Sequence, residues 1–491
     1  MRDLKDQLAD YWVQLDEEFP EITPEELRRG ESSSPVSPRR LMRRPLLVAV
    51  SAAAVLILVL GAVVLLDPFG ADETPFVEEP TTVSTATTRP APTTTEAATA
   101  TTATVVAEVP VIVWERIESD AFSAPGPLTI EEVIVGGPGL IAVGTIWSEP
   151  ATGVIWYSTD GETWTRVPHD EQIFGEASIR AVTPGGPGFV AVGSVAGPDE
   201  DGAAAVWVSE DGITWSRVPH DEAVFGGPTL EEMLDVTAGG PGLVAVGWDN
   251  PLEGWDASAA VWTSTDGLTW ERVPHDENTF GGARMQMMWA VTTDGSRLVA
   301  VGHDGLWSGS GGSDQPAAVW TSPDGLNWTR VSDQEQLTTG RSGNGDWAVM
   351  HDVIAGGPGF VGVGRIGWCS AGCDETGAAW TSVDGTNWQR SQVEQAVGIT
   401  YTHMNGLVEF AEVLVGVGRG FDPASGQGPA VLWMSLDNGE SWMRQPHDGA
   451  LFGKVSEGPV TMNTVIEFGS ELIAVGDWGD NAAVWIGTIE N

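Results

Sequence analysis

The sequence predicts an all-β fold, a seven-bladed β-propeller with four-stranded antiparallel blades, preceded by one transmembrane helix. A Trp-x-Ser-x-Asp-Gly-x-x-Trp segment recurs about every 50–60 residues, and residues 46–66 form one uncharged apolar run. The copies begin at Trp156, Trp207, Trp262, Trp320, Trp380 and Trp433, the last with Asn438 inserted in its turn. A unit of this length cannot bury both of its faces alone, so it has to stack on copies of itself.

The chain before the repeats divides into three segments. Residues 1–44 are polar and are predicted to be a cytoplasmic tail, and residues 45–66 are predicted to be the transmembrane helix, since the run at 46–66 spans about 31 Å as a helix. Residues 67–109 are rich in Thr, Pro and Ala and are predicted to be a disordered stalk, either glycosylated or bare. A cleavable signal peptide is disfavoured because a long polar region precedes the apolar run.

Charges beside the apolar run predict the orientation of the chain. Four arginines precede it directly, at positions 39, 40, 43 and 44, and acidic residues follow it. The positive-inside rule then places the N-terminus in the cytoplasm and the propeller outside the cell, in a single-pass membrane protein. Within residues 1–20, apolar side chains recur at helical spacing, which predicts a short amphipathic helix that either docks a cytosolic partner or is a marginal helix beside the membrane.

The net charge excludes one class of partner. The formal charge is −46, and residues 45–491 carry most of it, with 59 acidic and 15 basic side chains. So strong a negative field repels nucleic acid and anionic lipid. We expect neutral, cationic or metal-bridged partners.

Each repeat contains four strand-like runs separated by Gly, Pro and Asp turns. In the second repeat these runs are residues 179–183, 189–193, 203–209 and 214–218. Asp-Gly favours a tight hairpin, and a two-residue loop there would pair Tyr157 with Trp164. A seventh third-strand tryptophan, Trp485, lacks a following strand, whereas residues 113–117 copy residues 269–273, a fourth strand. The propeller is therefore predicted to span 110–491, with the first strand closing the last blade.

The hairpin also carries a family resemblance. Ser435, Asp437, Gly439 and Trp442 match the Asp-box motif, with Ser441 where the motif has Thr. Residues 110–491 resemble the bacterial-type neuraminidase-repeat, or Asp-box, propellers, which include sialidases. The resemblance implies the fold, but it implies little about activity because the Asp-box lies on a structural turn far from the catalytic site of those enzymes.

A sialidase would need three arginines for the substrate carboxylate and a Tyr paired with Glu. Arginines outside the repeated post-hairpin position are Arg180, Arg284, Arg297, Arg341, Arg365 and Arg419. Tyr401 is the sole candidate nucleophile, because Tyr157 belongs to a hairpin and the Arg-Ile-Pro signature of many sialidases is absent. We therefore assign no catalytic residue.

Propeller connectivity separates two kinds of loop. The repeated turns share one face, here called the framework face, and the variable loops share the opposite face, here called the irregular face. Candidate ligand-binding residues on the irregular face are Trp147, Trp248, Trp255, Trp307, Trp368, Asp249, Asp256 and Asp304. Aromatic rings beside carboxylates suit sugars or cations, and the alternative is that the tryptophans plug the ring.

Two further motifs are read as structural. Cys369 and Cys373 lie in one loop on the oxidising side and are predicted to form a disulfide, since they lack the His spacing of a zinc site. The His-Asp pairs at 169–170, 220–221, 275–276 and 447–448 are predicted to cap loops rather than to bind metal. No cofactor is predicted, and calcium is retained as an alternative because the loops are acidic.

The sequence thus predicts a membrane-anchored extracytoplasmic propeller that binds a carbohydrate or protein ligand. A binding protein is favoured over an enzyme. The first alternative is a sialidase-like glycoside hydrolase, and the second is a structural or assembly factor for envelope proteins.

Overall fold

The computed structural model describes most of the predicted propeller. The described residues are 110–490 apart from 197–201, 227–229, 251–256, 283–284, 306–314, 333, 339–345, 370–372, 396–400, 422–426 and 454–457, and the side chains of 369, 373 and 490 are also excluded. The predicted tail, transmembrane helix and stalk lie outside these residues. Among the helices of the described part, none combines the length and the apolarity needed to cross a bilayer.

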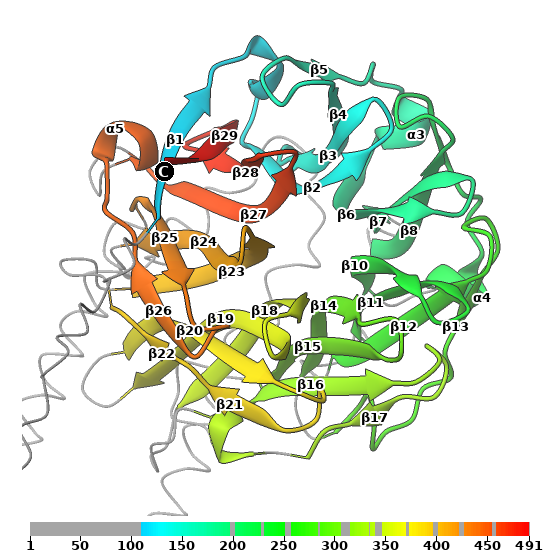
Figure 1. Ribbon diagram of the computed structural model, residues 1–491. Coiled ribbons are helices and arrows are strands. Elements are labelled where there is room, and N and C mark those ends of the chain that lie inside the picture. Colours follow the sequence, from blue (N-terminus) through cyan, green and yellow to red (C-terminus); the bar gives the residue numbers. More distant parts are fainter. Residues whose placement is uncertain are drawn as a thin grey trace, which may run out of the picture. The chain divides into compact units, whose positions relative to one another are not determined.

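The described strands form seven sheets, one for each predicted blade (Figure 1). Blade 1 contains β2 (Leu128–Gly136), β3 (Gly139–Ile146), β4 (Thr152–Ser158) and β5 (Trp164–Arg166). Blade 2 contains β6 (Ala177–Gly185), β7 (Gly188–Ala196), β8 (Gly202–Ser209) and β9 (Trp215–Arg217). Blade 3 contains β10 (Leu230–Gly239), β11 (Gly242–Asn250), β12 (Ser258–Ser264) and β13 (Trp270–Arg272). Blade 4 contains β14 (Gln286–Thr293), β15 (Leu298–Asp304), β16 (Ala317–Ser322) and β17 (Thr329–Arg330).

The remaining three blades continue the same order. Blade 5 contains β18 (Trp347–Gly356), β19 (Gly359–Cys369), β20 (Cys373–Ser382) and β21 (Trp388–Arg390). Blade 6 contains β23 (Tyr401–Phe410), β24 (Val413–Phe421), β25 (Ala430–Ser435) and β26 (Ser441–Arg444). Blade 7 contains β27 (Val460–Phe468), β28 (Glu471–Trp478) and β29 (Asn481–Glu490), and is completed by β1 (Val111–Ile117). Figure 1 shows the first strand of each blade around the ring axis.

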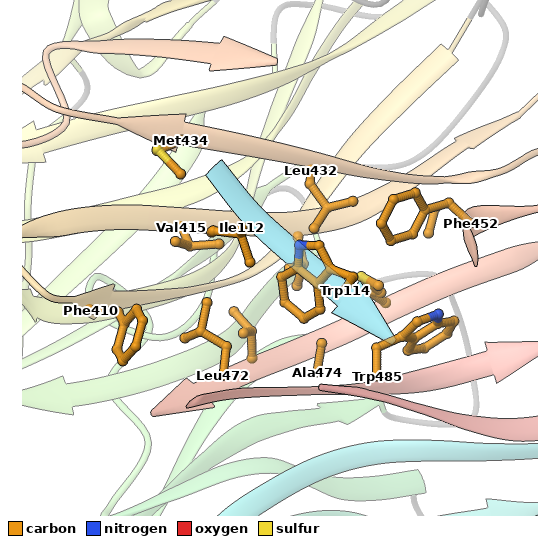
Figure 2. Packing of buried hydrophobic residues seen from close by; sticks show 14 of the residues in the cluster. Ile112, Trp114, Phe410, Val415, Leu432, Met434, Phe452, Leu472, Ala474 and Trp485 are labelled. Atoms are coloured by element: carbon orange, nitrogen blue, oxygen red, sulfur yellow. The ribbon is translucent and has the colours of Figure 1, made fainter. Parts of the chain in front are cut away.

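Closure of the ring by the first strand is confirmed. Strand β1 pairs antiparallel with β29, with Trp114 opposite Gly487. Ile112 and Trp114 pack against Trp485 of the same blade and Leu432 of blade 6, so the two ends of the domain share one core (Figure 2). Sealing the ring in this way removes two open sheet edges.

Blade 6 departs from the predicted four strands. A short strand β22 (Gln392–Val393) pairs parallel with β26 and makes this sheet five-stranded. Five of the other junctions carry short helices instead, which are η1 (Asp120–Phe122), α3 (Glu171–Phe174), α4 (Glu222–Phe225), η2 (Glu335–Leu337) and α5 (Gly449–Phe452), and the junction of blades 3 and 4 carries a turn at 277–280. The segment at β22 reads Ser-Gln-Val rather than Val-Pro-His-Asp, so it lacks the helix-capping aspartate.

The hairpin turns are longer than two residues, which corrects the predicted pairing. Ser158 pairs with Trp164, and Tyr157 pairs with Thr165. The turn is longer because its aspartate carboxylate accepts hydrogen bonds from backbone amides two and three residues later in the turn. In blade 2, Asp211 Oδ1 accepts hydrogen bonds from the amides of Ile213 at 2.8 Å and Thr214 at 2.7 Å, and these bonds lower the pKa of Asp211 to about 2.

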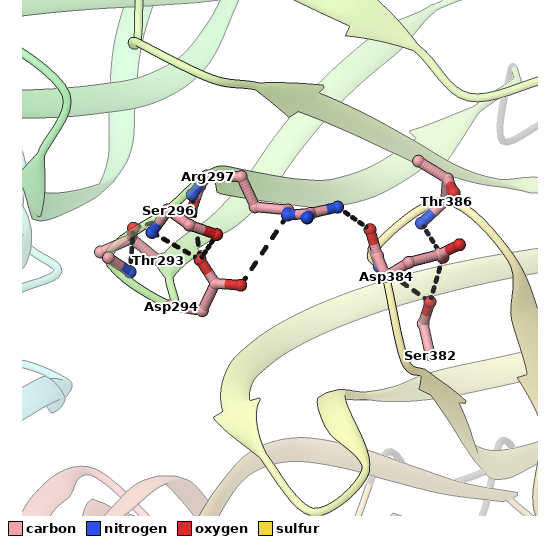
Figure 3. A network of polar contacts seen from close by, with 9 residues as sticks. Thr293, Asp294, Ser296, Arg297, Ser382, Asp384 and Thr386 are labelled. Atoms are coloured by element: carbon pink, nitrogen blue, oxygen red, sulfur yellow. Dashed lines mark hydrogen bonds and ion pairs between the residues drawn. The ribbon is translucent and has the colours of Figure 1, made fainter.

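The same turn also docks on the preceding blade. Gly212 adopts a positive φ of 76°, and a Cβ there would lie 2.5 Å from Cδ1 of Ile141 in blade 1. Glycine is therefore required both for the backbone conformation and for the close approach. On the same framework face, Nη1 of Arg297 in blade 4 donates to the carbonyl of Asp384 in blade 5 at 2.6 Å (Figure 3).

The third-strand tryptophans tie each blade to the segment that precedes it. All seven are at most 1 % exposed, and each indole N–H donates to a backbone carbonyl at 2.6–3.3 Å. The acceptors, in blade order, are the carbonyls of Ala121, Ile173, Val224, Thr279, Gln336, Glu394 and Leu451. A buried indole N–H needs a partner, so each tryptophan fixes an inter-blade segment as well as filling a core.

The predicted capping role of the repeated aspartates is confirmed. Asp170, Asp221 and Asp448 are the N-caps of α3, α4 and α5, and each carboxylate accepts the amide two residues later at 2.8–3.0 Å. Asp276 makes the same bond to Asn278 at 3.1 Å. Their histidine neighbours pack on a phenylalanine or pair with a glutamate, as His169 does with Glu171 at 3.0 Å. Three of these motifs are therefore helix caps, and Asp276 caps a turn.

The first strand of every blade contains a β-bulge at the same place. The extra residues are Glu131, Arg180, Leu234, Trp289, His351, Asn405 and Asn463. Several reach the neighbouring blade, as when Nδ2 of Asn463 donates to the carbonyl of Ile130 at 2.9 Å. A bulge re-aims a side chain and breaks regular pairing, so these strands present polar groups near the ring axis.

Buried carboxyls follow three of these bulges. Glu132, Asp235 and Asp352 accept the amides of Val182, Val291 and Leu407 in the next blade at 2.6, 2.7 and 3.1 Å. Burial raises the pKa of Asp235 to about 6 and that of Asp352 to about 7, the latter raised further by the charge of Asp235. The ionised forms are therefore costly in the folded protein.

This arrangement predicts that the contribution of Asp235 and Asp352 to stability declines as the pH rises. Between about pH 4 and pH 7 the folded protein holds protons on Asp235 and Asp352 that the unfolded chain has released, so their contribution is lost as pH rises through the folded pKa. Asp352→Asn should flatten the dependence, and at pH 5 it should be less stable than the wild type, because its amide nitrogen replaces an oxygen that accepts a backbone N–H. Denaturant unfolding at pH 5 and pH 8 checks this, with exposed Asp480→Asn as the control, and an unchanged slope in Asp352→Asn would contradict it.

The turn aspartates give a second prediction. Asp211→Ala removes the acceptor of two amides and should lower the melting temperature by about 1–4 °C, whereas Asp211→Asn, which keeps Oδ1, should lower it less. Calorimetry of the two variants measures the difference. Equal melting temperatures for both would show that the captured amides do not hold the turn.

Candidate functional site

Polar and aromatic side chains of blades 4–6 gather where the irregular loops leave the ring. Strands β19 and β24 end on this face and β18 and β23 begin on it, because neighbouring strands are antiparallel. In blade 6, His403 lies opposite Arg419, and in blade 5, Val349 lies opposite Arg365. The bulges in β18 and β23 follow directly, so the irregular stretch of each first strand borders the site.

Two arginines meet at one histidine and one carboxylate. Nε2 of His403 lies 2.6 Å from Oε2 of Glu375, Nε of Arg419 lies 3.3 Å from Nδ1 of His403, and Nη1 of Arg365 lies 2.9 Å from Nε2. One ring nitrogen cannot both donate to Glu375 and accept from Arg365, so the shorter contact assigns the proton to Nε2. His403 is then the neutral tautomer that donates to Glu375 and accepts from Arg419.

Aromatic rings continue from this histidine across three blades. Ring centroids lie 6.1 Å apart from Trp289 to His351, 6.1 Å from His351 to His403, 5.1 Å from His403 to Phe421 and 5.1 Å from Phe421 to Tyr401. Each arginine also lies over a ring, with Arg365 5.0 Å from the Trp347 centroid and Arg419 5.2 Å from that of Phe421. Such contacts hold the guanidinium planes in place.

The histidines here are uncharged at neutral pH. Burial lowers the pKa of His403 far below its ordinary value, and the charges of Arg365 and Arg419 lower it further. The same two causes, burial first and Arg365 second, lower the pKa of His351 and bring that of His303 to about 4. Nδ1 of His303 accepts the indole N–H of Trp289 at 3.0 Å, which requires a neutral ring.

The balance of charge at this point is positive. Burial raises the pKa of Glu375, which Arg365 and Arg419 oppose, and burial lowers the pKa of both arginines. A further carboxyl, Asp477 of blade 7, interacts with Arg419, and burial together with Glu131 raises its pKa to about 7. Two guanidiniums therefore share one carboxylate and a second group that is only partly ionised at neutral pH.

Tyr401, the candidate nucleophile, is packed against a neighbouring ring and is not activated for nucleophilic attack. It is 9 % exposed, and its ring stacks on Phe421 with an angle of 17° between the planes. Burial raises the pKa of its phenol, and the charges of Asp374 and Glu375 raise it further. The resting side chain is therefore the neutral phenol, which is a weak nucleophile.

A second charged cluster lies on blades 1–3. Arg180 pairs with Glu131 at 3.2 Å and with Glu232 at 2.7 Å, and its guanidinium lies 5.0 Å from the Trp147 centroid. These partners raise the pKa of Arg180 against the effect of burial, which lowers it. Arg180 is thus engaged by two carboxylates of its neighbouring blades. It differs from Arg365 and Arg419, which share one.

The predicted ligand residues are dispersed. Trp147 is 41 % exposed and covers Arg180, whereas Asp249 and Asp304 form ion pairs with the post-hairpin arginines Arg272 and Arg330. Asp304 also accepts Nε2 of Gln286 at 2.8 Å. These two carboxylates therefore hold the fourth strands of their own blades.

The other predicted residues have different outcomes. Trp248 is half-buried, and Trp368 lines a pocket on blade 5. Trp255, Asp256 and Trp307 lie outside the described residues. The backbone register places Cys369 opposite Cys373, but their side chains are not among those described, so the disulfide stays a prediction.

Sequence reasoning singled out Arg365, Arg419 and Tyr401 but missed His351 and His403. His351, His403 and Glu375 do not recur in other repeats, so no periodic signal marks them. Their meeting depends on the bulges and on strand register. Within the described residues, no group of three or more His, Cys, Asp or Glu side chains could hold a metal ion.

Comparisons with known proteins found distant likenesses. No family model and no curated protein matches the chain. Among solved structures, an ulvan lyase of polysaccharide lyase family 25 is 11 % identical, with 76 % of this chain and 95 % of that chain covered and a TM-score of 0.43. A Trypanosoma rangeli sialidase mutant with trans-sialidase activity is 12 % identical, covering 76 % and 58 %, at a TM-score of 0.41.

A third similar structure is the Penicillium chrysogenum α-L-arabinanase in complex with arabinobiose. It is 14 % identical, with 66 % of this chain and 96 % of that chain covered and a TM-score of 0.37. All three likenesses are too distant to carry function to this chain. The class defined by the structure is a seven-bladed β-propeller with a charged, aromatic site on its irregular face.

The shared carboxylate predicts a measurable instability. Glu375→Gln removes the ion pair of Arg365 and the carboxylate bonded to His403, leaves Arg419 with Asp477, and should lower the free energy of unfolding by about 1–3 kcal/mol in low salt. Added sulfate should stabilise this variant more than the wild type, because the guanidiniums gain an external anion. Denaturant unfolding with and without sulfate measures this, and the neighbouring exposed Asp374→Asn is the control. Equal sulfate responses in all three proteins would contradict it.

Proposed function

We propose that the protein is a membrane-anchored, extracytoplasmic recognition propeller whose site on blades 5 and 6 binds a carbohydrate that carries a carboxylate. The observation that carries the proposal is the convergence of Arg365 and Arg419 on His403, which is bonded to Glu375. Guanidinium groups held on rings keep their forks oriented, and an oriented fork suits a carboxylate.

A carbohydrate is favoured over other anions by the surroundings of the arginines. Neutral imidazoles and the Glu375 carboxylate can exchange hydrogen bonds with hydroxyl groups, and the rings of Phe421 and Tyr401 offer apolar faces. The chain as a whole has a charge of −46, which opposes every anion but repels polyanions such as nucleic acids far more strongly than a sugar with one or two carboxylates. A carboxylated ligand therefore depends on the local positive charge of Arg365 and Arg419, and it departs from the neutral or cationic partner expected from the net charge alone.

Two observations favour binding over hydrolysis, the principal alternative. The pKa of Tyr401 is raised and its ring is packed flat on Phe421. Two of the non-scaffold arginines meet here, and Arg180 is held by Glu131 and Glu232 of other blades. The hydrolase alternative remains testable because Tyr401 lies on the same strand as His403.

The test is calorimetric titration of digalacturonate, with neutral cellobiose for comparison, into the purified full-length chain in detergent. Digalacturonate should bind, and Arg365→Ala or Arg419→Ala should weaken it at least about 10-fold, since each removes a charge-assisted pair. Arg297→Ala, on the framework face, is the matched control and should bind like the wild type.

Two results would overturn the proposal. If digalacturonate still binds after both arginine substitutions, the arginines are not its binding site. If it does not bind to the wild type at all, the proposed class of ligand is wrong. Release of methylumbelliferone from its sialoside by the wild type, lost in Tyr401→Phe, would instead establish the hydrolase.

A further inference from the structure

A separate pocket of about 310 Å³ lies on the irregular face at the outer part of blade 5. Its lining includes Trp368, Thr376, Arg390, Ser391, Val393 and Gln395. The volume falls at the lower end of the range for small-molecule sites.

The pocket exists because the fourth strand is shorter than the third. Strand β20 runs from Cys373 to Ser382, whereas β21 covers only Trp388–Arg390, which pair with Ser382 to Trp380. The outer edge of β20 beyond Trp380 is therefore not covered by a fourth strand. The segment that leads to blade 6 passes beside this edge and forms the opposite wall.

Blade 1 has a pocket at the equivalent place, and its chemistry differs. That pocket has a volume of about 340 Å³. Ser148 in blade 1 occupies the position of Trp368 in blade 5, and Val167 occupies the position of Ser391. Val occupies the position of Ser391 in blades 1–4, as Val167, Val218, Val273 and Val331, each at most 9 % exposed. Compared with the blade 1 pocket, the blade 5 pocket therefore has an additional aromatic side chain and an additional hydroxyl. The other blades fold without either group at these positions.

The inter-blade segment contributes further to this difference. At other junctions a side chain from the segment is buried between blades, such as Phe174, which also lines the blade 1 pocket. After blade 5 the segment forms β22 instead, and half-buried Val393 and exposed Gln395 stand beside the pocket. Replacing the large apolar side chain by these residues makes the pocket more polar.

Two hydroxyls in the pocket are unsatisfied. Oγ1 of Thr376 and Oγ of Ser391 are buried atoms, and neither has a hydrogen-bonding partner among the described residues. A buried hydroxyl without a partner is costly, and rotation of each side chain about χ1 would turn its hydroxyl toward a ligand in the pocket, which would recover that cost. The side chain of Arg390 is close by, anchored by a 2.7 Å bond from Nη1 to the carbonyl of Thr338.

We propose that this pocket binds a neutral sugar residue, with one face of the sugar on Trp368 and its hydroxyls bonded to Thr376 and Ser391. An aromatic face beside hydroxyl groups matches the alternating apolar and polar surfaces of a sugar ring. The site is independent of the arginine site, since side chains alternate along β19. Arg365 lies beside His403 of blade 6, whereas Ile366 packs in the core shared by blades 4 and 5.

The test is saturation-transfer NMR on the full-length chain with xylobiose, cellobiose and maltose as probes. At least one disaccharide should bind, and Trp368→Ala should weaken it at least about 10-fold through loss of the stacking face. Ser391→Val should weaken it several-fold, and it should fold normally because four other blades carry Val at this position. Ser148→Ala in the blade 1 pocket is the control and should leave binding unchanged.

Three outcomes would overturn the proposal. The first is no binding of any of the three disaccharides to the wild type, and the second is wild-type binding by both Trp368→Ala and Ser391→Val. Loss of the neutral sugar in Arg365→Ala with retention in Trp368→Ala would place it in the arginine site. Loss of digalacturonate binding alone, in the arginine variants, leaves this pocket untouched and so separates the two proposals.

Discussion

Each blade of this protein is a sheet with two apolar faces, and the burial of both faces by its neighbours is the constraint on which the structure depends. No blade can satisfy that requirement alone, so the ring has to close, and β1 from the start of the domain completes blade 7. The tryptophan N–H bonds then couple every blade to the segment before it. The repeated residues therefore serve mainly to make contacts between blades.

The arginine site follows from the same constraint. Once the outer strands are committed to packing, variation is left to the first strands and to the irregular loops. Bulges in the first strands turn side chains out of regular pairing, and the consequence is local: His351 reaches the carbonyl of Met404 at 3.1 Å in the next blade, directly beside His403. Arg365 and Arg419 can then share partners across two blades, which neither blade could arrange alone.

How much could be predicted depends on what repeats. The Trp-x-Ser-x-Asp-Gly-x-x-Trp segment recurs, so the seven blades, the closure by residues 113–117 and the two faces could be derived from the sequence. The turn register was wrong because the Asp160 carboxylate captures the amides of Glu162 and Thr163, which holds a longer loop than Asp-Gly suggests. Asp249 and Asp304 proved to pair with scaffold arginines, since register decides which carboxylates meet which cations. His403 and Glu375 occur once each, so only the fold brings them together.

The central claim is that the arginine pair is a ligand site and not a second kind of structural lock. A crystal structure of the protein with bound digalacturonate tests this most directly. The account predicts a carboxylate within hydrogen-bonding distance of the guanidiniums of Arg365 and Arg419, with Glu375 displaced or bonded to a sugar hydroxyl. Density for the ligand elsewhere on the ring, with the arginines still closed on His403 and Glu375, would contradict it.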